Sequence, residues 1–389
     1  MVHRELERQV DQAFAAGNNQ QGLQLLRDLS VERPQDAEIW HRLSVVEEQI
    51  GSTENATAAH LNCLECSPGN PLAYFYAGYW YEQLGRTAEA LSLYSLGTDI
   101  VELTLAPGDR GTQSPQTRIR FEAGDRALRT HLSGLHRRAV GVDAGNQRIA
   151  DAIWTRSHDQ VFRFSESEQM PQMFYIRGLS PVVEVDSLSW VKPLEAVAED
   201  IRDEFLAALP RVAEQGRPYL PAETVAEAGF GSLVDSLDWT ALDLFKDGER
   251  DESIAQYFPK TLSALSQIPL YGLFEWPSEV FFSILKAGQH IKPHYGLSNH
   301  SLTVHLPINV PENCWIIVKG KKHFWQEGEV YLFDDTFLHE AINNSTDERV
   351  VLIFSVWHPD LSDAERAAVK RSFQARHNWL AARDVSTLA

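Results

Sequence analysis

Residues 280–310 read VFFSILKAGQHIKPHYGLSNHSLTVHLPINV, and residues 328–359 read GEVYLFDDTFLHEAINNSTDERVVLIFSVWHP. Both stretches consist of short β-rich runs broken by Gly, Pro and Asn, a pattern typical of antiparallel strands. Seven of the 14 histidines lie between His290 and His358. The residues that could do chemistry are therefore concentrated in one compact sheet structure.

Two of these runs alternate in a way that predicts what lies on each face. Along 301–306, three aliphatic side chains share one face, and His305 lies on the opposite face with Ser and Thr. Residues 349–356 are apolar on both faces except at Arg349 and one Ser. A strand that is apolar on both faces except for one His or Arg favours a small barrel or jelly roll that holds a ligand inside.

Size and charge limit the class of protein. The chain has 389 residues, enough for two or three domains, and a net charge of -19, which argues against sequence-independent nucleic-acid binding. The first residues, MVHRELERQVDQAF, contain no apolar core of a secretion signal, and no run of about 20 apolar residues predicts a membrane span. Three cysteines suit a reducing compartment. We expect a cytoplasmic protein with neither a nucleic-acid nor a membrane partner.

The first 105 residues carry a repeat. Glycine, proline and aromatic residues recur at an interval of 34 residues: Gly17, Gly51 and Gly85; Pro34 and Pro68; Trp40 and Tyr74. This period resembles tetratricopeptide repeats and predicts helical hairpins with helices near 37–50, 54–66, 71–84 and 87–96. A protein partner could bind these repeats; the alternative is a helical array without a binding function. Cys63 and Cys66 indicate packing, because no second ligand pair accompanies them.

The rest of the chain predicts two further regions. Residues 106–170 read as a helical linker region that begins with the turn-rich stretch APGDRGTQSPQT and contains helical patterns over 121–138 and 146–156. Residues 171–389 form the β-rich domain with flanking helices, expected at 192–209, 257–266 and 363–382. The whole is an α+β protein.

Two histidines of the β-rich domain are candidate metal ligands. His294 and His339 stand 45 residues apart on separate expected strands and could converge on one ion. Imidazole suits Fe, Zn, Cu and Ni, and the usual non-haem iron site adds one carboxylate. Gly296 stands where that carboxylate is expected, and Asp335 could orient an imidazole as an outer partner. The alternative is that both histidines are structural or surface residues.

A second group of side chains could hold a carboxylate. Arg349 would face the inside of the barrel, where its guanidinium can hold a carboxylate through two parallel hydrogen bonds. Ser283 and His305, on strands of the same barrel, offer further hydrogen bonds. The alternative for Arg349 is an exposed strand end.

An ordered series of motifs resembles one known family. They are Asp238-Trp239, Asp247-Gly248-Glu249-Arg250, Pro259-Lys260-Thr261, Ser283-Ile284-Leu285, Pro293-His294-Tyr295-Gly296, Val304-His305-Leu306, Trp325-Gln326-Glu327-Gly328, Phe333 to Glu340, Arg349 and Val356-Trp357-His358-Pro359. The stretch from about 170 to 365 resembles the aspartyl/asparaginyl β-hydroxylases, a family of Fe(II)- and 2-oxoglutarate-dependent oxygenases. An N-terminal helical repeat also occurs in that family.

The resemblance implies a fold, a cofactor set and a substrate class. The fold is a double-stranded β-helix, a jelly roll. Fe(II) is held by His294 and His339 without a protein carboxylate. Arg349 and Ser283 hold the distal carboxylate of 2-oxoglutarate, and His305 contacts its other end. Molecular oxygen and 2-oxoglutarate are consumed while the β-carbon of an Asp- or Asn-type residue is hydroxylated, in a peptide, a protein or a related small molecule.

One departure bears on the substrate. The family commonly has Arg two residues before the position of His305, and often another basic residue two before that; this sequence has Thr303 and Ser301. Arg217 could supply the missing charge in space. Two other functions stay open: a non-catalytic repeat-based interaction module with a degenerate ligand-binding barrel, and a metal-dependent hydrolase or isomerase. Arg349 without a catalytic acid–base pair disfavours the hydrolase, and the joint presence of both histidines and Arg349 disfavours the degenerate barrel.

Overall fold

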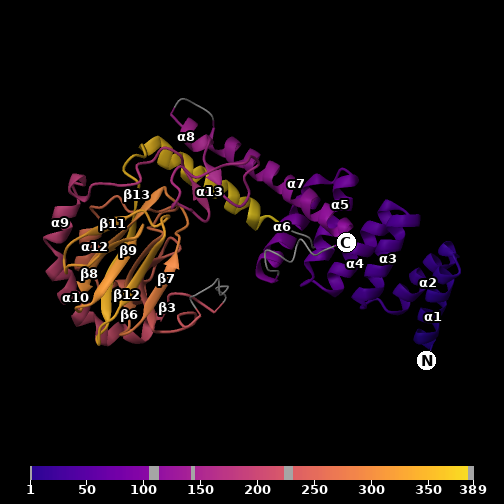
Figure 1. Cartoon of the computed structure of the whole chain (residues 1–389), viewed down its shortest axis with the longest axis horizontal. Helices are drawn as coiled ribbons and strands as arrows, with labels where there is room; N and C mark the ends of the chain where they lie inside the picture. Colours follow the sequence, from indigo (N-terminus) through magenta and orange to yellow (C-terminus); the bar gives the residue numbers. More distant parts are fainter. Residues whose placement is uncertain (1, 105–113, 142–144, 223–230, 384–389) are drawn as a thin grey trace. The chain divides into compact units, whose positions relative to one another are not determined.

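The computed structural model (Figure 1) describes residues 2–104, 114–141, 145–222 and 231–383. Contacts divide the chain into two compact units, one formed by the residues up to 133 together with those from 377 onward, the other by 134–376. Helices α7 (Pro115–Val140) and α13 (Asp363–Ala381) contribute to both units. The division therefore does not follow the expected boundaries at 105 and 170, because the expected linker contains a helix that is shared by the units. Residues 105–113 of that linker lie outside the described residues.

The first unit contains the predicted helical hairpins. The six helices of the hairpins are α1 (Val2–Ala15), α2 (Asn19–Glu32), α3 (Ala37–Ile50), α4 (Thr53–Cys66), α5 (Pro71–Gln83) and α6 (Thr87–Thr104). Three of them begin at a side chain that accepts hydrogen bonds from the exposed backbone N–H groups of the first turn: Asp36, Ser52 and Asn70. The tetratricopeptide-like architecture is thus confirmed for this unit.

The repeated glycines serve two different purposes. Gly17 and Gly85 have φ of 75°, a left-handed conformation that ends a helix and disfavours other residues. Gly51 has φ of -99°, so its backbone needs no glycine. A Cβ there would lie 1.8 Å from Oε2 of Glu47. At this position the period reflects close packing rather than backbone geometry.

The second unit is built around two antiparallel sheets. The larger sheet has the order β11-β8-β13-β6-β4-β3, with β5 paired to β4. Its strands are β3 (Arg217–Pro218), β4 (Trp239–Lys246), β5 (Glu249–Arg250), β6 (Glu279–Leu285), β8 (Ser301–Asn309), β11 (Tyr331–Phe333) and β13 (Arg349–Trp357). The smaller sheet has the order β10-β9-β12-β7, with β7 (His290–His294), β9 (Cys314–Val318), β10 (Lys321–His323) and β12 (His339–Asn343). The predicted jelly-roll domain is confirmed.

Helices cover the outer face of the larger sheet. Alternate strand residues, including Val304, Leu352 and Phe282, join a core with Ile201 and Phe205 of the covering helices. These helices are α9 (Val191–Glu195), α10 (Ala198–Val212), α11 (Glu252–Ala255) and α12 (Pro259–Leu265), and Figure 1 shows α9 and α10 along one side of the strands. The single helix expected at 192–209 is therefore two helices.

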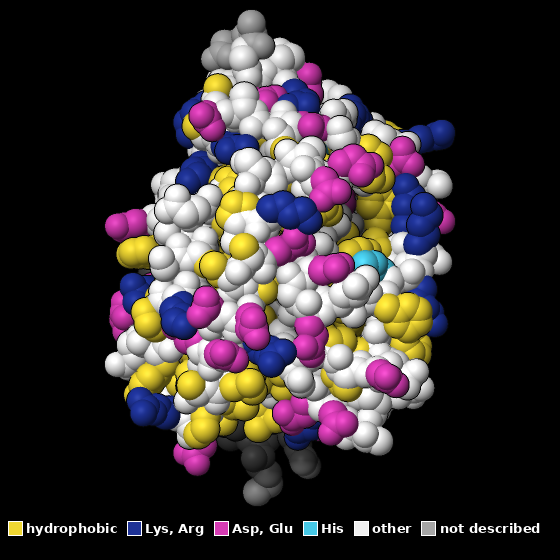
Figure 2. All heavy atoms as spheres, turned by 90° about the vertical axis from the view of Figure 1, so that its left-hand side faces the viewer, with side chains coloured by type: hydrophobic (Ala, Val, Ile, Leu, Met, Phe, Trp, Pro, Cys, Tyr) yellow, Lys and Arg dark blue, Asp and Glu magenta, His cyan; other side chains and the backbone are white. Residues whose placement is uncertain are grey.

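The same helices border a cavity on this outer face. It has a volume of about 790 Å³ and is lined by side chains in or beside α9, α10 and α12, among them Trp190, Ile201 and Lys260. Figure 2 shows this side of the molecule, where acidic and basic side chains are interspersed with apolar ones. Because the cavity lies on the sheet face opposite His305, it is separate from the predicted site. None of the described helices is long and apolar enough to cross a membrane.

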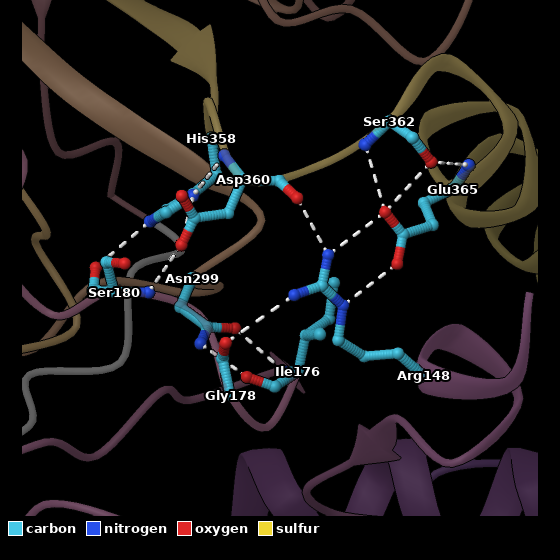
Figure 3. Close-up of polar contacts among 9 residues, drawn as sticks. All are labelled: Arg148, Ile176, Gly178, Ser180, Asn299, His358, Asp360, Ser362 and Glu365. Carbon is cyan, nitrogen blue, oxygen red and sulfur yellow. Dashed lines mark hydrogen bonds and ion pairs between the residues drawn. The ribbon is translucent and has the colours of Figure 1, made fainter. Parts of the chain in front are cut away.

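Residues 148–180, which precede the larger sheet in the sequence, are hydrogen-bonded to residues at the ends of its strands. After α8 (Gln147–Ala150), the chain forms β1 (Ile153–Trp154) and β2 (Phe174–Tyr175) instead of the helix expected over 146–156. Figure 3 shows how a polar network holds this segment. Arg148 pairs with Glu365 of α13 at 2.9 Å, and the Asn299 amide exchanges two hydrogen bonds of 2.8 Å with the backbone of Ile176. The start of β8 is thereby fixed.

Candidate functional site

The two predicted metal ligands lie side by side in the smaller sheet. His294 of β7 and His339 of β12 are partners in the strand register, and their ring centroids are 4.0 Å apart. Nδ1 of His294 lies 2.7 Å from the carbonyl oxygen of Lys292, and Nδ1 of His339 lies 2.9 Å from that of Phe337. An Nδ1–H that donates to a carbonyl leaves the lone pair of a neutral imidazole on Nε2.

Burial keeps both imidazoles neutral. Desolvation, aided by the neighbouring ring of His339, lowers the pKa of His294 to about 4. Desolvation also lowers the pKa of His339. Both rings are therefore uncharged at neutral pH, which is the form in which histidine binds metals. Backbone carbonyls orient them, so the Asp335 carboxylate is not needed for the orienting role considered above.

Asp335 instead fills the space beside Gly296. A Cβ at position 296 would lie 2.1 Å from the carboxyl carbon of Asp335, and the backbone N–H of Gly296 donates to the Asp335 carbonyl at 2.7 Å. The absence of a side chain at 296 thus makes room for this carboxylate. Burial raises the pKa of Asp335 to about 6, and its Oδ2 accepts a hydrogen bond of 3.2 Å from Thr303.

Three buried donor groups lie together deeper between the two sheets. Arg349 is only 1% exposed, and its guanidinium lies 5.2 Å from the ring centroid of Trp325. His305 packs against the same indole, with ring centroids 5.7 Å apart. Arg349 Nε, His305 Nδ1 and Trp325 Nε1 have no hydrogen-bond partner among the described residues. Since unpaired buried polar groups are destabilising, this arrangement fits an anionic ligand.

Electrostatics distinguish the members of this group. Burial lowers the pKa of Arg349 to about 10, so the guanidinium stays charged at neutral pH. Burial, with the charge of Arg349 as the next cause, holds the pKa of His305 well below its usual value. The site therefore presents one buried cation beside a neutral imidazole.

Ser283 lies on the same face of the larger sheet as Arg349. It pairs with Val351 in the register, two residues from Arg349 along β13, and it is fully buried. Its Oγ accepts a hydrogen bond of 3.1 Å from Trp239 Nε1. The Ser283 hydroxyl can still donate its own proton to a ligand.

Arg217 does not replace the basic residue missing at position 303. Its Nε and Nη2 donate to the two carboxylate oxygens of Asp243, at 2.5 and 3.0 Å, and its Nη1 donates to the backbone carbonyls of Pro218 and Tyr219. Thr303 itself donates to Asp335. The inner face of the larger sheet near the two histidines therefore carries carboxylates, in contrast to the Arg349 end.

Sequence reasoning missed two features of the site. Trp325 was part of a motif, yet nothing in its spacing showed that a loop residue would lie under Arg349. The contact between Gly296 and Asp335 joins positions 39 apart and has no local signal. In the part of the chain that the structure describes, no group of three or more His, Cys, Asp and Glu side chains could hold a metal ion. What the chain assembles is the pair His294 and His339.

Comparisons with known proteins agree with this architecture. Residues 195–359 match the profile of the family described as Aspartyl/Asparaginyl beta-hydroxylase. Aspartyl/asparaginyl beta-hydroxylase of Homo sapiens is 27% identical over 94% of this chain and 44% of its own length. The Mus musculus protein of the same name is 25% identical over 95% of this chain and 46% of its own length. The chain thus spans less than half the length of these relatives.

Shorter and weaker likenesses cover parts of the chain. Aspartate beta-hydroxylase domain-containing protein 2 of Mus musculus is 40% identical over 22% of this chain and 26% of its own length. Among solved structures, the Yersinia enterocolitica type III secretion chaperone SycD is 18% identical, with a TM-score of 0.26 over 31% of this chain and 90% of that chain. The Schizosaccharomyces pombe Cnp3 cupin domain is 9% identical, with a TM-score of 0.21 over 31% of this chain and 66% of that chain.

The profile match spans the strands that carry His294, His305, His339 and Arg349, and the matches to the human and mouse proteins extend over nearly the whole chain. Over residues 195–359, the chain is therefore similar to the aspartyl/asparaginyl beta-hydroxylase family.

Proposed function

We propose that the barrel is an Fe(II)- and 2-oxoglutarate-dependent oxygenase that hydroxylates a side chain in a peptide, a protein or a related small molecule. The observation that carries the proposal is the buried Arg349, which has no carboxylate partner among the described residues and belongs to the same barrel as two neutral, adjacent histidines. The family relatives, named as beta-hydroxylases of aspartyl and asparaginyl residues, support the reaction type.

The residues present fit an iron ion with few protein ligands. His294 and His339 would hold it through Nε2, since both Nδ1 atoms face backbone carbonyls. Gly296 adds no ligand, so positions on the ion stay open for a chelating cosubstrate and oxygen. When bound, iron supplies the activation of molecular oxygen, coupled to the oxidation of 2-oxoglutarate to succinate and carbon dioxide.

The chain's own residues would bind and orient the cosubstrate. Arg349 forms a charge-assisted pair with its distal carboxylate, and Trp325 and His305 lie against this position. Ser283 donates from the neighbouring strand. The surrounding apolar side chains, Leu285, Ile291, Ile316 and Phe333, exclude water from this end of the chamber.

The helical repeats give the first unit a separate role in the proposal. They would bind the protein that carries the side chain to be hydroxylated, in the cytoplasm, where three unpaired cysteines stay reduced. The barrel would then act on a segment of that partner.

Anaerobic titration with Fe(II) and measurement of succinate formed from 2-oxoglutarate test the function. His339→Ala should lower Fe(II) affinity at least about 100-fold, because a site with two protein ligands tolerates the loss of neither. His41→Ala, an exposed histidine on α3, is the matched control and should bind iron as the native protein does. Unchanged iron affinity in His339→Ala, or no iron-dependent succinate in the native protein, would refute the proposal.

A further inference from the structure

The inner face of the larger sheet carries opposite charges at its two ends. Arg349 and Thr303 share the inner face of the larger sheet, and Thr303 pairs with Ser355, six residues beyond Arg349 on β13. At the rise of an extended strand, this separates the two ends by about 20 Å. The Arg349 end is cationic. The Thr303 end, which lies beside the two histidines, carries carboxylates.

Three residues, named here the acidic wall, make up this end: Asp243, Glu279 and Asp335. Asp243 of β4 pairs with Phe281 of β6, and Glu279 lies two residues before Phe281, so both carboxylates belong to the inner face. Asp335 accepts the hydrogen bond from Thr303. Burial and then the charge of Asp243 raise the pKa of Glu279 to about 7, and Asp335 contributes to the shift.

The acidic wall has more negative charge than the neighbouring cations balance. Arg217 pairs with Asp243, and no ion pair with a described residue joins either Glu279 or Asp335. The other nearby cations are engaged elsewhere or exposed: Lys319 at 3.7 Å from Glu166, Lys292 at 3.1 Å from His290, and Lys246, which is opposite Glu279 in the register but faces solvent. Glu279 and Asp335 therefore lie at this end of the inner face without an ion-pair partner among the described residues.

Aromatic and aliphatic groups accompany these carboxylates. Tyr219 stacks on Trp239 with ring centroids 4.2 Å apart and on Phe281 at 5.2 Å. The charge of Glu279 is the first cause that raises the pKa of Tyr219, which places the carboxylate near the phenol. Leu297, three residues after His294, and Leu338, immediately before His339, are 59% and 39% exposed. Exposed leucines suit the long aliphatic stem of a basic side chain.

We propose that the side chain presented to the histidine pair is positively charged, an amine or a guanidinium, rather than a carboxylate. This rests on the proposed function, because it names the substrate class of that same site. The unpaired donors at the Arg349 end select an anion there, which the cosubstrate supplies. At the other end Glu279 and Asp335 would repel an acidic side chain and attract a basic one.

The test compares binding of peptide pools that differ at one position. Four pools of capped heptapeptides, randomised except for a central Arg, Lys, Gln or Asp, are passed over the immobilised full chain, with and without Mn(II) and 2-oxoglutarate. Retained peptide is measured by mass spectrometry. We expect the Arg and Lys pools to be retained at least about tenfold more than the Asp pool, the ratio for one charge-assisted contact.

Matched variants separate the site from the general attraction of a chain with net charge -19 for cations. The comparison is made at pH 8, above the pKa of about 7 of Glu279, where Glu279→Gln removes one charge from the acidic wall and Glu312→Gln removes one from an exposed turn between β8 and β9. The preference for basic pools should fall about tenfold in Glu279→Gln and persist in Glu312→Gln. Thr303→Arg, which brings a guanidinium to Asp335 from β8, should abolish the preference too and serves as the second variant if Glu279→Gln misfolds.

Equal retention of the four pools, at any level, would overturn the inference, as would a preference unchanged in both Glu279→Gln and Thr303→Arg. Failure of the proposed function is distinguishable from this. If only the proposed function is wrong, the protein will show a charge preference in binding without iron-dependent succinate formation. If only the proposed substrate class is wrong, the protein will form succinate without a charge preference.

Discussion

Two buried arginines, one in each unit, show how differently the fold treats the same side chain. Arg120 of α7 is 6% exposed, and its guanidinium lies 4.1 Å from the ring centroid of Tyr76. Arg349 of β13 is 1% exposed and lies 5.2 Å from Trp325. Arg120 donates to Glu48 at 2.5 Å. Arg349 has no acidic partner in the described part of the chain.

The surroundings of Glu48 show what a complete network looks like. Besides Arg120, it accepts hydrogen bonds from His60 at 2.8 Å and from Trp80 at 2.5 Å. Each donor is supplied by the helices of the first unit, so this network contributes to stability. At Arg349 the donors are assembled without an acceptor. A buried charge needs a partner, and where the fold lacks one, a ligand can provide it.

Removing Arg120 should have the largest effect. Arg120→Met keeps the stem over Tyr76 but leaves the buried Glu48 without its guanidinium partner, which destabilises by about 3–5 kcal/mol. Urea unfolding of the first unit measures this, and binding of 2-oxoglutarate should be unchanged. Arg126→Met, an exposed arginine of the same helix, is the control and should change stability by less than about 0.5 kcal/mol. A comparable loss in both variants would mean that the pairing with Glu48 is immaterial.

Removing Arg349 should have the opposite signature. Arg349→Met takes away an unpaired buried charge, so the unliganded barrel should unfold at the same or a higher urea concentration. Binding of 2-oxoglutarate, measured by calorimetry, should weaken about 100-fold, because a charge-assisted pair is worth about 1.5–3 kcal/mol. A large loss of stability with intact 2-oxoglutarate binding would place Arg349 with Arg120 as a structural residue.

The sequence predicted those parts of this contrast that depend on local patterns. Strand alternation put Arg349 and His305 on an inner face, because side chains alternate with a period of two whatever the tertiary contacts. The 34-residue period located the hairpins that contain Glu48 and His60. Long-range contacts were not predictable in this way. Trp325, which packs against Arg349, comes from a loop, where no periodic pattern shows which way a side chain points.

The acidic end of the chamber is a second case. Asp335 reaches Gly296 through the pairing of β7 with β12, whose register shifts between His339 and Ala341. No pattern in either strand encodes this shift. Arg217 was a reasonable substitute for the basic residue absent at 303, yet its partner Asp243 lies on a neighbouring strand. Pairing between charges was thus the part of the site that sequence did not reveal.

His300 shows a third way to bury a cationic group, and it gives the smallest of the expected effects. Its side chain is 1% exposed, and neither ring nitrogen has a hydrogen-bond partner in the described residues. Four aromatic rings surround it: Phe174, Tyr271, Trp357 and Phe373. Burial lowers the pKa of His300 to about 3, so this group stays neutral instead of finding a partner.

The stability of the second unit should therefore depend on pH through His300. In the unfolded chain its pKa is about 6.5. Between the folded pKa of about 3 and the unfolded pKa, His300 is protonated in the unfolded state but not in the folded state. The free energy of unfolding therefore decreases as the pH falls below the unfolded pKa. Between pH 7 and pH 5 the loss is about 2 kcal/mol. His300→Phe, which keeps an aromatic ring in the same surroundings, should remove this pH-dependent loss of stability.

The measurement is the difference in unfolding free energy between His300→Phe and the native protein, in metal-free samples, at both pH values. Other titrating groups are common to both proteins and cancel. The difference should favour the variant by about 2 kcal/mol more at pH 5 than at pH 7, and a difference independent of pH would show that His300 finds a partner when protonated, as Arg120 does.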